Sequence, residues 1–433
     1  MRRKHNLSKL MPGWRQLSLT YGFTASDSVR LTLPDRLNVN SILPPAARLG
    51  LDPIRSKVQT KPSRPTTIRV LQLINGEHFA GAERVQDNLG LQLPVEGIET
   101  AFACVKPGRF DEMRGSRETP LYNLPMRNRL DVRPAFRLAK LIEREGFDLL
   151  HTHTPRTAMI GAFAARIAGV PFVHHVHGQT ATEVNAGWKQ RLVTRVENRS
   201  IRRAEFVIAV SHTAGEYLGQ HGIPSERVVV VPNGIVGPAK FTTKLPPDQN
   251  QNWTLGIIGL LRPRKGLEVL LRSLASLIEQ GHNVTLRAVG PFETDEYREA
   301  ILQLTAELKL DQHVTWRGFQ KDVTAELAAM DAFVFPSILP EGMPMVLLEA
   351  MAHGVPIVAS RVPGVVDCVE DGRDAILVAP DQPAEMASGI SRLMSNADLW
   401  TRLREQARAR QQAEFSVAAM ATRIAKIYRQ VVA

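Results

Sequence analysis

The sequence predicts an α/β protein with two domains, each organised around a doubly wound parallel sheet. Short apolar segments rich in Val, Ile and Phe alternate with segments of helical periodicity from residue 68 to about 237, and the alternation resumes at residue 254. Between the two series, residues 238–253 are rich in Pro, Asn and Gln, which is typical of a linker. A chain of 433 residues is also too long for a single hydrophobic core.

Before the first domain, the chain begins with a basic leader that shows no sustained periodicity. It holds 12 Lys and Arg residues against 3 Asp and Glu residues, so most of the net charge of +11 belongs to it. Its scattered prolines predict poor order. An arm attracted to anionic lipid and a segment without function are both open interpretations. The predicted parts are a leader over 1–66, a first domain over 67–237, a linker over 238–253, a second domain over 254–412, and a final helix over 413–433.

Composition excludes several classes of protein. The hydrophobic fraction of 44% and the charged fraction of 22% are ordinary for a soluble chain, and no run of 18 apolar residues occurs. Only Cys104 and Cys368 are present, without the spacing of a disulfide framework or a metal site, which favours a reducing, cytoplasmic setting. Because the basic residues are concentrated in the leader and no folded basic face is evident, we expect no nucleic-acid partner.

The first domain is predicted to contain six strands and five helices. The strands are expected over 68–74, 99–105, 147–154, 171–178, 204–211 and 227–235. The helices are expected over 85–93, 134–145, 159–170, 191–203 and 212–223. The helix over 191–203 is basic and amphipathic, so it predicts either a membrane-facing or a solvated surface.

The second domain repeats the pattern and is predicted to end on helices. Its strands are expected to begin near 254, 284, 313, 331 and 355, followed by a strand and turn within 361–380. Its helices are expected over 267–280, 297–310 and 344–353, with a final helix over 415–432.

One strand–helix–strand unit of the second domain carries a distinctive pair of carboxylates. Pro344 is expected at the first helical position and Gly354 just past the helix end. Glu341 lies in the loop before the helix and Glu349 within it. A helix start at the carboxyl edge of a parallel sheet suits an anion such as a diphosphate, and the carboxylates could then contact hydroxyl groups of the ligand.

The pattern Glu341, seven residues, Glu349, within EGMP…LLEAMAHGVPIVAS, resembles the E-x7-E signature of retaining GT-B glycosyltransferases of family 4, also called glycosyl transferases group 1. The resemblance extends over about 67–433. It implies a GT-B fold, with two Rossmann-like domains that face a central cleft. It also implies catalytic roles for Glu341, His177 and Lys265. The donor-binding residues that it implies are Arg262, Arg264, Gly342, Met343, Pro344, Met345, Glu349, Gly318 and Gly81.

Two loops depart from the family pattern. The glycine-bearing turn after the first strand reads Ala80 to Glu83, so only Gly81 matches one of its two glycines. In the loop that resembles the diphosphate-binding G-R-L…K-G segment, Lys265 matches the lysine, but Leu260 replaces the arginine. Arg262 or Arg264 could supply the missing cation, and the sequence does not decide between them.

Histidines cluster at two predicted strand ends. His177, in HVHG, matches a histidine that reaches the donor sugar in the family, whereas a structural role is the alternative. His151 and His153 share one strand face, as do His175 and His177, and such spacing is also compatible with a metal site. No acidic or Cys ligand accompanies them, so the sequence predicts no metal ligand.

The resemblance implies a metal-independent hexosyltransferase or related enzyme that retains anomeric configuration and needs no cofactor. Its expected partners are a nucleotide-sugar donor and a glycan or lipid-linked acceptor of surface polysaccharide or glycoconjugate synthesis. Contact with the cytoplasmic face of an anionic membrane is a further expectation. A sugar-nucleotide epimerase or hydrolase on the same fold is the alternative, and so is a non-catalytic partner subunit, suggested by the loss of the arginine at Leu260.

Overall fold

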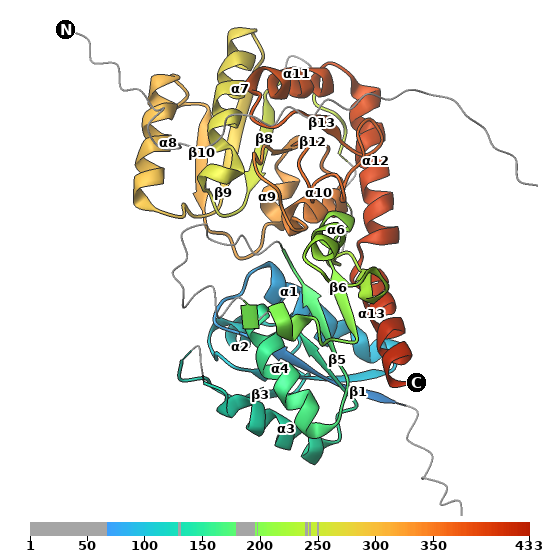
Figure 1. The fold of residues 1–433 in the computed structure, drawn as a ribbon. Coiled ribbons are helices and arrows are strands. Elements are labelled where there is room, and N and C mark those ends of the chain that lie inside the picture. The colour runs from blue at the N-terminus through green and yellow to red at the C-terminus, as the bar shows by residue number, and fades with distance from the viewer. Residues whose placement is uncertain are drawn as a thin grey trace, which may run out of the picture. The chain divides into compact units, whose positions relative to one another are not determined.

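The computed structural model describes residues 67–128, 131–178, 195–196, 198–238, 241, 244–248 and 251–433. The predicted leader lies outside the described residues. Of the predicted basic helix over 191–203, residues 191–194 and 197 also lie outside them, and residues 198–201 are helical. The described chain forms two parallel sheets with helices packed on both faces (Figure 1).

The first sheet has seven parallel strands in the order β3-β2-β1-β4-β5-β6-β7, which is a doubly wound arrangement. The sequence did not predict β3, because three residues on a sheet edge are too short to show periodicity. The strands are β1 (Ile68–Ile74), β2 (Ile98–Cys104), β3 (Leu121–Asn123), β4 (Leu149–Thr152), β5 (Phe172–Val176), β6 (Phe206–Ala209) and β7 (Val228–Val230).

Local capping fixes the helices that follow these strands. The side chain of Thr154 accepts a hydrogen bond from the N–H of Thr157 at the start of α4, and Gly169 ends that helix in a left-handed conformation. The short helix α2 was not predicted. The helical segments are α1 (Gly81–Gln92), η2 (Leu93–Glu96), α2 (Arg109–Met113), α3 (Arg133–Glu145), α4 (Pro155–Ala168), α6 (His212–Gln220) and η3 (Ser225–Arg227).

The second sheet has six parallel strands in the order β10-β9-β8-β11-β12-β13, again doubly wound. Its strands are β8 (Trp253–Ile258), β9 (Val284–Val289), β10 (Val314–Gly318), β11 (Ala332–Phe335), β12 (Ile357–Ser360) and β13 (Ile376–Val378). Its helical segments are η4 (Pro263–Lys265), α7 (Leu267–Glu279), α8 (Asp295–Glu307), α9 (Thr324–Ala328), α10 (Met345–His353), α11 (Pro383–Met394), α12 (Ala397–Glu414) and α13 (Val417–Val432).

The last helix, α13, packs against the first domain rather than the second. The Tyr428 hydroxyl lies 2.6 Å from Nδ1 of His151, and Arg429 donates a hydrogen bond to the Glu96 carbonyl at 2.6 Å. Gly234 allows this return of the chain, because a Cβ there would lie 2.6 Å from the Ser416 carbonyl oxygen. The C-terminal helix is thereby held beside β4 and η2.

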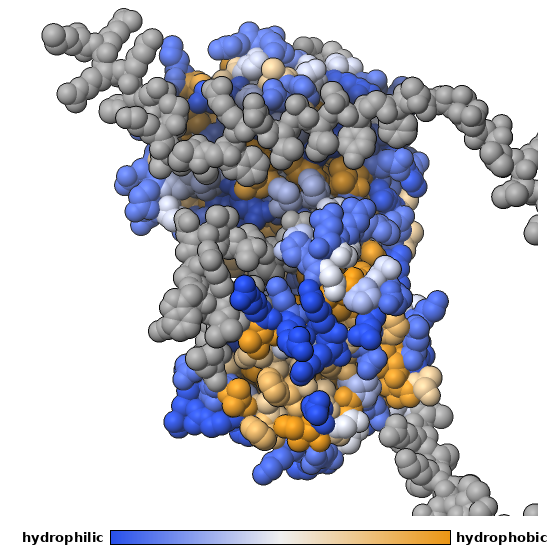
Figure 2. Space-filling view, in the orientation of Figure 1, coloured by the Kyte–Doolittle hydropathy of each residue, from blue (hydrophilic) through white to orange (hydrophobic). Residues whose placement is uncertain are grey.

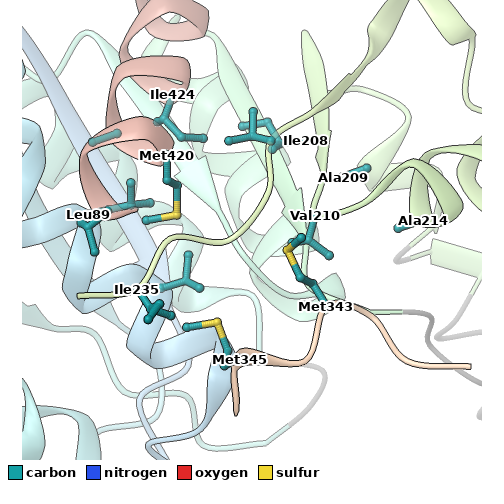
Figure 3. Close-up of a cluster of buried hydrophobic side chains, with 14 of the residues drawn as sticks. Leu89, Ile208, Ala209, Val210, Ala214, Ile235, Met343, Met345, Met420 and Ile424 are labelled. Atoms are coloured by element: carbon teal, nitrogen blue, oxygen red, sulfur yellow. The ribbon is translucent and has the colours of Figure 1, made fainter. Parts of the chain in front are cut away.

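Apolar side chains join the two domains at a single cluster (Figure 3). Met343, from the loop before α10, and Met345, the first residue of α10, lie among side chains of the first domain and of α13. Because apolar burial is the main stabilising term in folding, this cluster holds the loop before α10 against the first domain. Its other labelled members are Leu89, Ile208, Ala209, Val210, Ala214, Ile235, Met420 and Ile424.

Candidate active site

The loop and helix that follow β11 form the centre of the candidate site. Pro344 is not the first helical residue but the residue before it: its ψ of 108° is extended, so α10 begins at Met345. Gly354 ends the helix with φ of 62°, which glycine adopts readily. The N-terminus of α10 therefore points its free backbone N–H groups toward the loop that carries Glu341.

Glu341 is nearly buried and is surrounded by donors. Its Oε1 accepts hydrogen bonds from Ser337 Oγ at 2.7 Å and from Lys265 Nζ at 2.9 Å. Arg264 Nη2 lies 3.8 Å from its Oε2, so two cations share this carboxylate. The structure thus brings together three of the residues that the sequence singled out.

The ammonium group of Lys265 is partly removed from water. Its ammonium lies 4.8 Å from the centre of the Phe335 ring and is partly buried. Burial lowers the pKa of Lys265, while the Glu341 carboxylate opposes that shift. The lysine is a partly desolvated cation, and such a cation acts more strongly on a bound anion than it would in water.

The two candidate arginines of this loop face different partners. Arg264 donates to the Pro340 carbonyl and approaches Glu341, whereas Arg262 Nη1 lies 3.4 Å from Glu293 Oε1. The geometry therefore favours Arg264 over Arg262 as the second cation near Glu341.

Glu349 is buried on α10 and is bound by a residue that sequence reasoning missed. Its Oε1 accepts a hydrogen bond from Arg84 of α1, and its Oε2 has no partner among the described residues. Arg84 directly follows the Ala80–Glu83 segment, and its position there was the one available signal. Glu83 itself is structural, since its carboxylate accepts from the Ala80 N–H at 3.2 Å at the start of α1.

The loop before α10 contacts the first domain closely enough to require glycine. A Cβ at Gly342 would lie 2.5 Å from the His177 carbonyl oxygen, which is too close. A Cβ at Gly81 would lie 3.6 Å from Met345 Cγ, which is an ordinary contact, so Gly81 is not required there. Within the described part of the chain, no acceptor is paired with the backbone N–H of Gly342, Met343 or Met345. These groups are available to an anion.

His177 and Gly318 lie at the ends of other strands than the one that precedes Glu341. His177 follows β5, and its Nε2 lies 3.0 Å from Nδ1 of His153. Desolvation lowers the pKa of His177 to about 4, so its ring is neutral at pH 7. Gly318 ends β10 at the outer edge of the second sheet, two strands from β8, and its φ of 61° explains the glycine.

Comparison with known families identifies this arrangement. Residues 252–396 match the model described as "Glycosyl transferases group 1", and residues 79–236 match the model described as "Glycosyltransferase Family 4". The chain belongs to the GT-B glycosyl transferases of group 1. The two matches together span every strand of both sheets except β1.

This glycosyltransferase is similar in sequence to enzymes of glycan synthesis. It is 26% identical to the Staphylococcus aureus capsular polysaccharide biosynthesis glycosyltransferase CapM over 302 residues, which cover 66% of this chain and 77% of CapM. It is 26% identical to the Escherichia coli UDP-Gal:alpha-D-GlcNAc-diphosphoundecaprenol alpha-1,3-galactosyltransferase over 259 residues, which cover 57% of this chain and 66% of that enzyme.

Solved structures share its fold. HepE of Anabaena, in complex with UDP, is similar with a TM-score of 0.71 at 23% identity, covering 84% of this glycosyltransferase and 100% of the HepE chain. WaaG, a glycosyltransferase involved in lipopolysaccharide biosynthesis, is similar with a TM-score of 0.62 at 18% identity, covering 83% and 99% of the two chains. The GT-B fold predicted from the sequence is confirmed.

Proposed function

We propose that this glycosyltransferase moves a sugar from a nucleoside diphosphate sugar to a glycan or lipid-linked acceptor of surface polysaccharide or glycoconjugate synthesis, with retention at the anomeric carbon. The observation that carries the proposal is the meeting of Glu341, Lys265 and Arg264 before the N-terminus of α10. A carboxylate flanked by two cations can contact sugar hydroxyls while the cations hold the diphosphate.

The named relatives suggest which donor to test first. HepE was solved with UDP and with UDP-glucose, and the name of the E. coli relative gives UDP-galactose as its donor. A uridine diphosphate hexose is therefore our preferred donor. Glu349, whose Oε2 has no described partner, would accept hydrogen bonds from the ribose hydroxyls. Gly318, at the carboxyl end of β10, would approach the base.

Charge development on the leaving diphosphate is the main demand of the transfer step. The N–H groups of Gly342, Met343 and Met345 and the positive end of α10 would bind the diphosphate oxygens. Lys265 and Arg264 would neutralise the charge that grows there. Glu341 would orient the donor sugar, and the neutral His177 would hold it by a hydrogen bond. The proposal assigns no cofactor and no metal to this step.

The test is an acceptor-dependence assay combined with a donor screen. Binding of UDP-, GDP- and ADP-sugars is first compared by thermal shift, since a ligand at 100 times its Kd stabilises a protein by about 2.7 kcal/mol. With the best donor, NMR of the product in the presence of lipid-linked glycan acceptors should show the donor's anomeric configuration. An inverted product would refute retention. Nucleotide release at the same rate with and without an acceptor would favour an epimerase or hydrolase.

Contact with an anionic membrane surface is part of the proposal, because the acceptor class includes lipid-linked glycans. On the neighbouring helices α3 and α4, the apolar side chains of Phe136, Phe163 and Ile167 are exposed, and so are the basic Arg137 and Lys140. Figure 2 shows apolar and polar groups side by side over this part of the molecule. Apolar and basic groups side by side suit an anionic lipid interface. No described helix is both long enough and apolar enough to cross a bilayer. Binding to anionic vesicles but not to neutral ones, at low salt, is the expected result.

A further inference from the structure

Four histidines lie on one face of two neighbouring strands in the first domain. His151 and His153 alternate along the end of β4, and His175 and His177 alternate along the end of β5. His174 belongs to the opposite face, where its Nδ1 lies 2.8 Å from Thr152 Oγ1. The period of two along a strand therefore separates a cluster of four rings from a fifth ring that has its own partner.

Each of these four rings has a buried nitrogen without a partner among the described residues. His151 and His153 each have a partner at Nδ1, the Tyr428 hydroxyl at 2.6 Å and His177 Nε2 at 3.0 Å respectively. The Nε2 atoms of both rings, and both nitrogens of His175, are buried without a partner among the described residues. Buried polar atoms without partners are unusual and destabilising, so these histidine nitrogens indicate a ligand-binding site.

We propose that His151, His153 and His175 form a binding site for a divalent transition-metal ion, with Zn²⁺ as the preferred occupant. One nitrogen from each ring lies within 4.8 Å of the other two. Tetrahedral Zn²⁺ with Zn–N bonds of about 2.0–2.1 Å needs nitrogens about 3.4 Å apart, so the rings must tilt toward a common centre. This site departs from the sequence-based expectation of no metal ligand.

The chemistry of the donor set selects the class of ion. Imidazole suits Zn²⁺, Cu²⁺ and Ni²⁺, whereas Mg²⁺ and Ca²⁺ require oxygen ligands that this cluster lacks among the described residues. Burial lowers the pKa of each of the three rings well below its usual value, so their lone pairs are free at neutral pH. Three ligands leave a fourth coordination position for water or another oxygen ligand.

A metal-bound histidine normally donates a hydrogen bond from its other ring nitrogen. The Nδ1 atoms of His151 and His153 each have such a hydrogen-bond partner. A metal on Nε2 keeps the proton of His151 on Nδ1, which then donates to Tyr428 of α13. In the same way His153 donates to His177 and fixes the tautomer of that ring. The metal would thus fasten α13 to the first domain and orient the neighbouring histidine. Only this last consequence rests on the proposed function.

The decisive experiment measures metal content rather than activity. Untagged full-length protein is stripped with a chelator and dialysed against buffered Zn²⁺, and the bound metal is measured by mass spectrometry. We expect one Zn²⁺ per chain, and with Co²⁺ the visible absorption of a tetrahedral site. A wild-type protein that binds no stoichiometric ion overturns the proposal.

Matched variants assign the site to these rings. His151→Gln, His153→Gln and His175→Gln should each weaken Zn²⁺ binding by more than about 100-fold, because loss of an outer partner alone typically costs about 10–100-fold. His174→Gln is the control: it removes a buried histidine from the same strand but from the opposite face, and it should keep the ion. If the first three variants still bind Zn²⁺ as tightly as the wild type, the assignment is overturned. It is also overturned if His174→Gln loses as much Zn²⁺ affinity as they do.

One further variant tests the site even if the glutamine variants fail to fold. Tyr428→Phe keeps the ring and removes only the hydroxyl that contacts His151. Circular dichroism should show a folded protein, and its Zn²⁺ affinity should fall by about 10–100-fold. Unchanged affinity in this folded variant would contradict the proposed coordination by His151.

Discussion

The carboxyl edges of the two sheets differ in the charge of the side chains that are buried there. At the edge of the second sheet, Glu341 is neutralised by Lys265 and Arg264, and Glu349 is neutralised by Arg84. At the edge of the first sheet, neutral imidazoles are buried, and several of their nitrogens have no partner within the part of the chain that the structure describes. Ion pairs can exchange partners with a charged ligand, whereas neutral imidazoles accept a metal ion or a hydrogen bond. In our proposal, recognition of the charged donor therefore belongs mainly to the second domain.

Removing Lys265 should have the largest effect on the charged edge. We expect Lys265→Ala to lower kcat by about 10²–10³-fold, which is typical when one stabilising donor is removed from a transition state. The Kd of UDP, measured by calorimetry, should change less, because the charge on the diphosphate grows during transfer. An equal loss in both quantities would mean that Lys265 contributes only to ground-state binding.

Removing Glu349 should weaken nucleotide binding rather than transfer. Two charge-assisted hydrogen bonds to ribose hydroxyls contribute about 1.5–3 kcal/mol each, so Glu349→Ala should raise the Kd of UDP at least about tenfold. Calorimetry gives the Kd, and the melting temperature serves as a check, since the change also leaves Arg84 without its partner. A Kd equal to that of the wild type would remove the ribose-binding role.

Arg262 and Arg264 test which second cation acts at the charged edge. Arg264→Ala should lower kcat by about tenfold, in line with loss of a charge-assisted hydrogen bond. Arg262→Ala should cost clearly less, because Arg262 faces Glu293 rather than Glu341. Steady-state kinetics of both variants decide the matter. If neither variant loses turnover, Arg84 becomes the next candidate for the second cation.

The smallest expected effect comes from the hydroxyl beside Glu341. Ser337→Ala removes the 2.7 Å hydrogen bond to Oε1, and a bond worth about 1 kcal/mol corresponds to roughly fivefold in kcat. Ser360→Ala is a matched control, since Ser360 is equally buried at the end of the next strand and its Oγ has no described partner. Equal losses in the two variants would show that Ser337 does not position Glu341.

The sequence could predict the local parts of this site because they depend on neighbouring residues. Two apolar strands, a proline before α10 and Gly354 after it define the unit that carries Glu341 and Glu349. The order of elements in both domains follows in the same way from periodicity. The three residues of β3 lie below the length at which periodicity becomes visible.

Contacts between residues far apart in the chain were beyond prediction. Arg84 binds Glu349 across 265 positions of sequence, and no local pattern reports such a pair. The choice between Arg262 and Arg264 depends on a single turn of 3-10 helix, whose side-chain directions the spacing does not fix. For the histidines, alternation showed which rings share a face. The unpartnered nitrogens depend on Tyr428, a residue of the last helix.

Two methionine sulfur atoms accept backbone hydrogen bonds near the junction of the two domains. Met343 Sδ accepts from the Asn233 N–H, and Met420 Sδ accepts from the Gly234 N–H, each at 3.1 Å. A thioether is a weak acceptor on a flexible side chain, so water can replace it at little enthalpic cost. If the two domains move relative to one another, the Met343 contact can re-pack, whereas the bond between Arg84 and Glu349 would have to break.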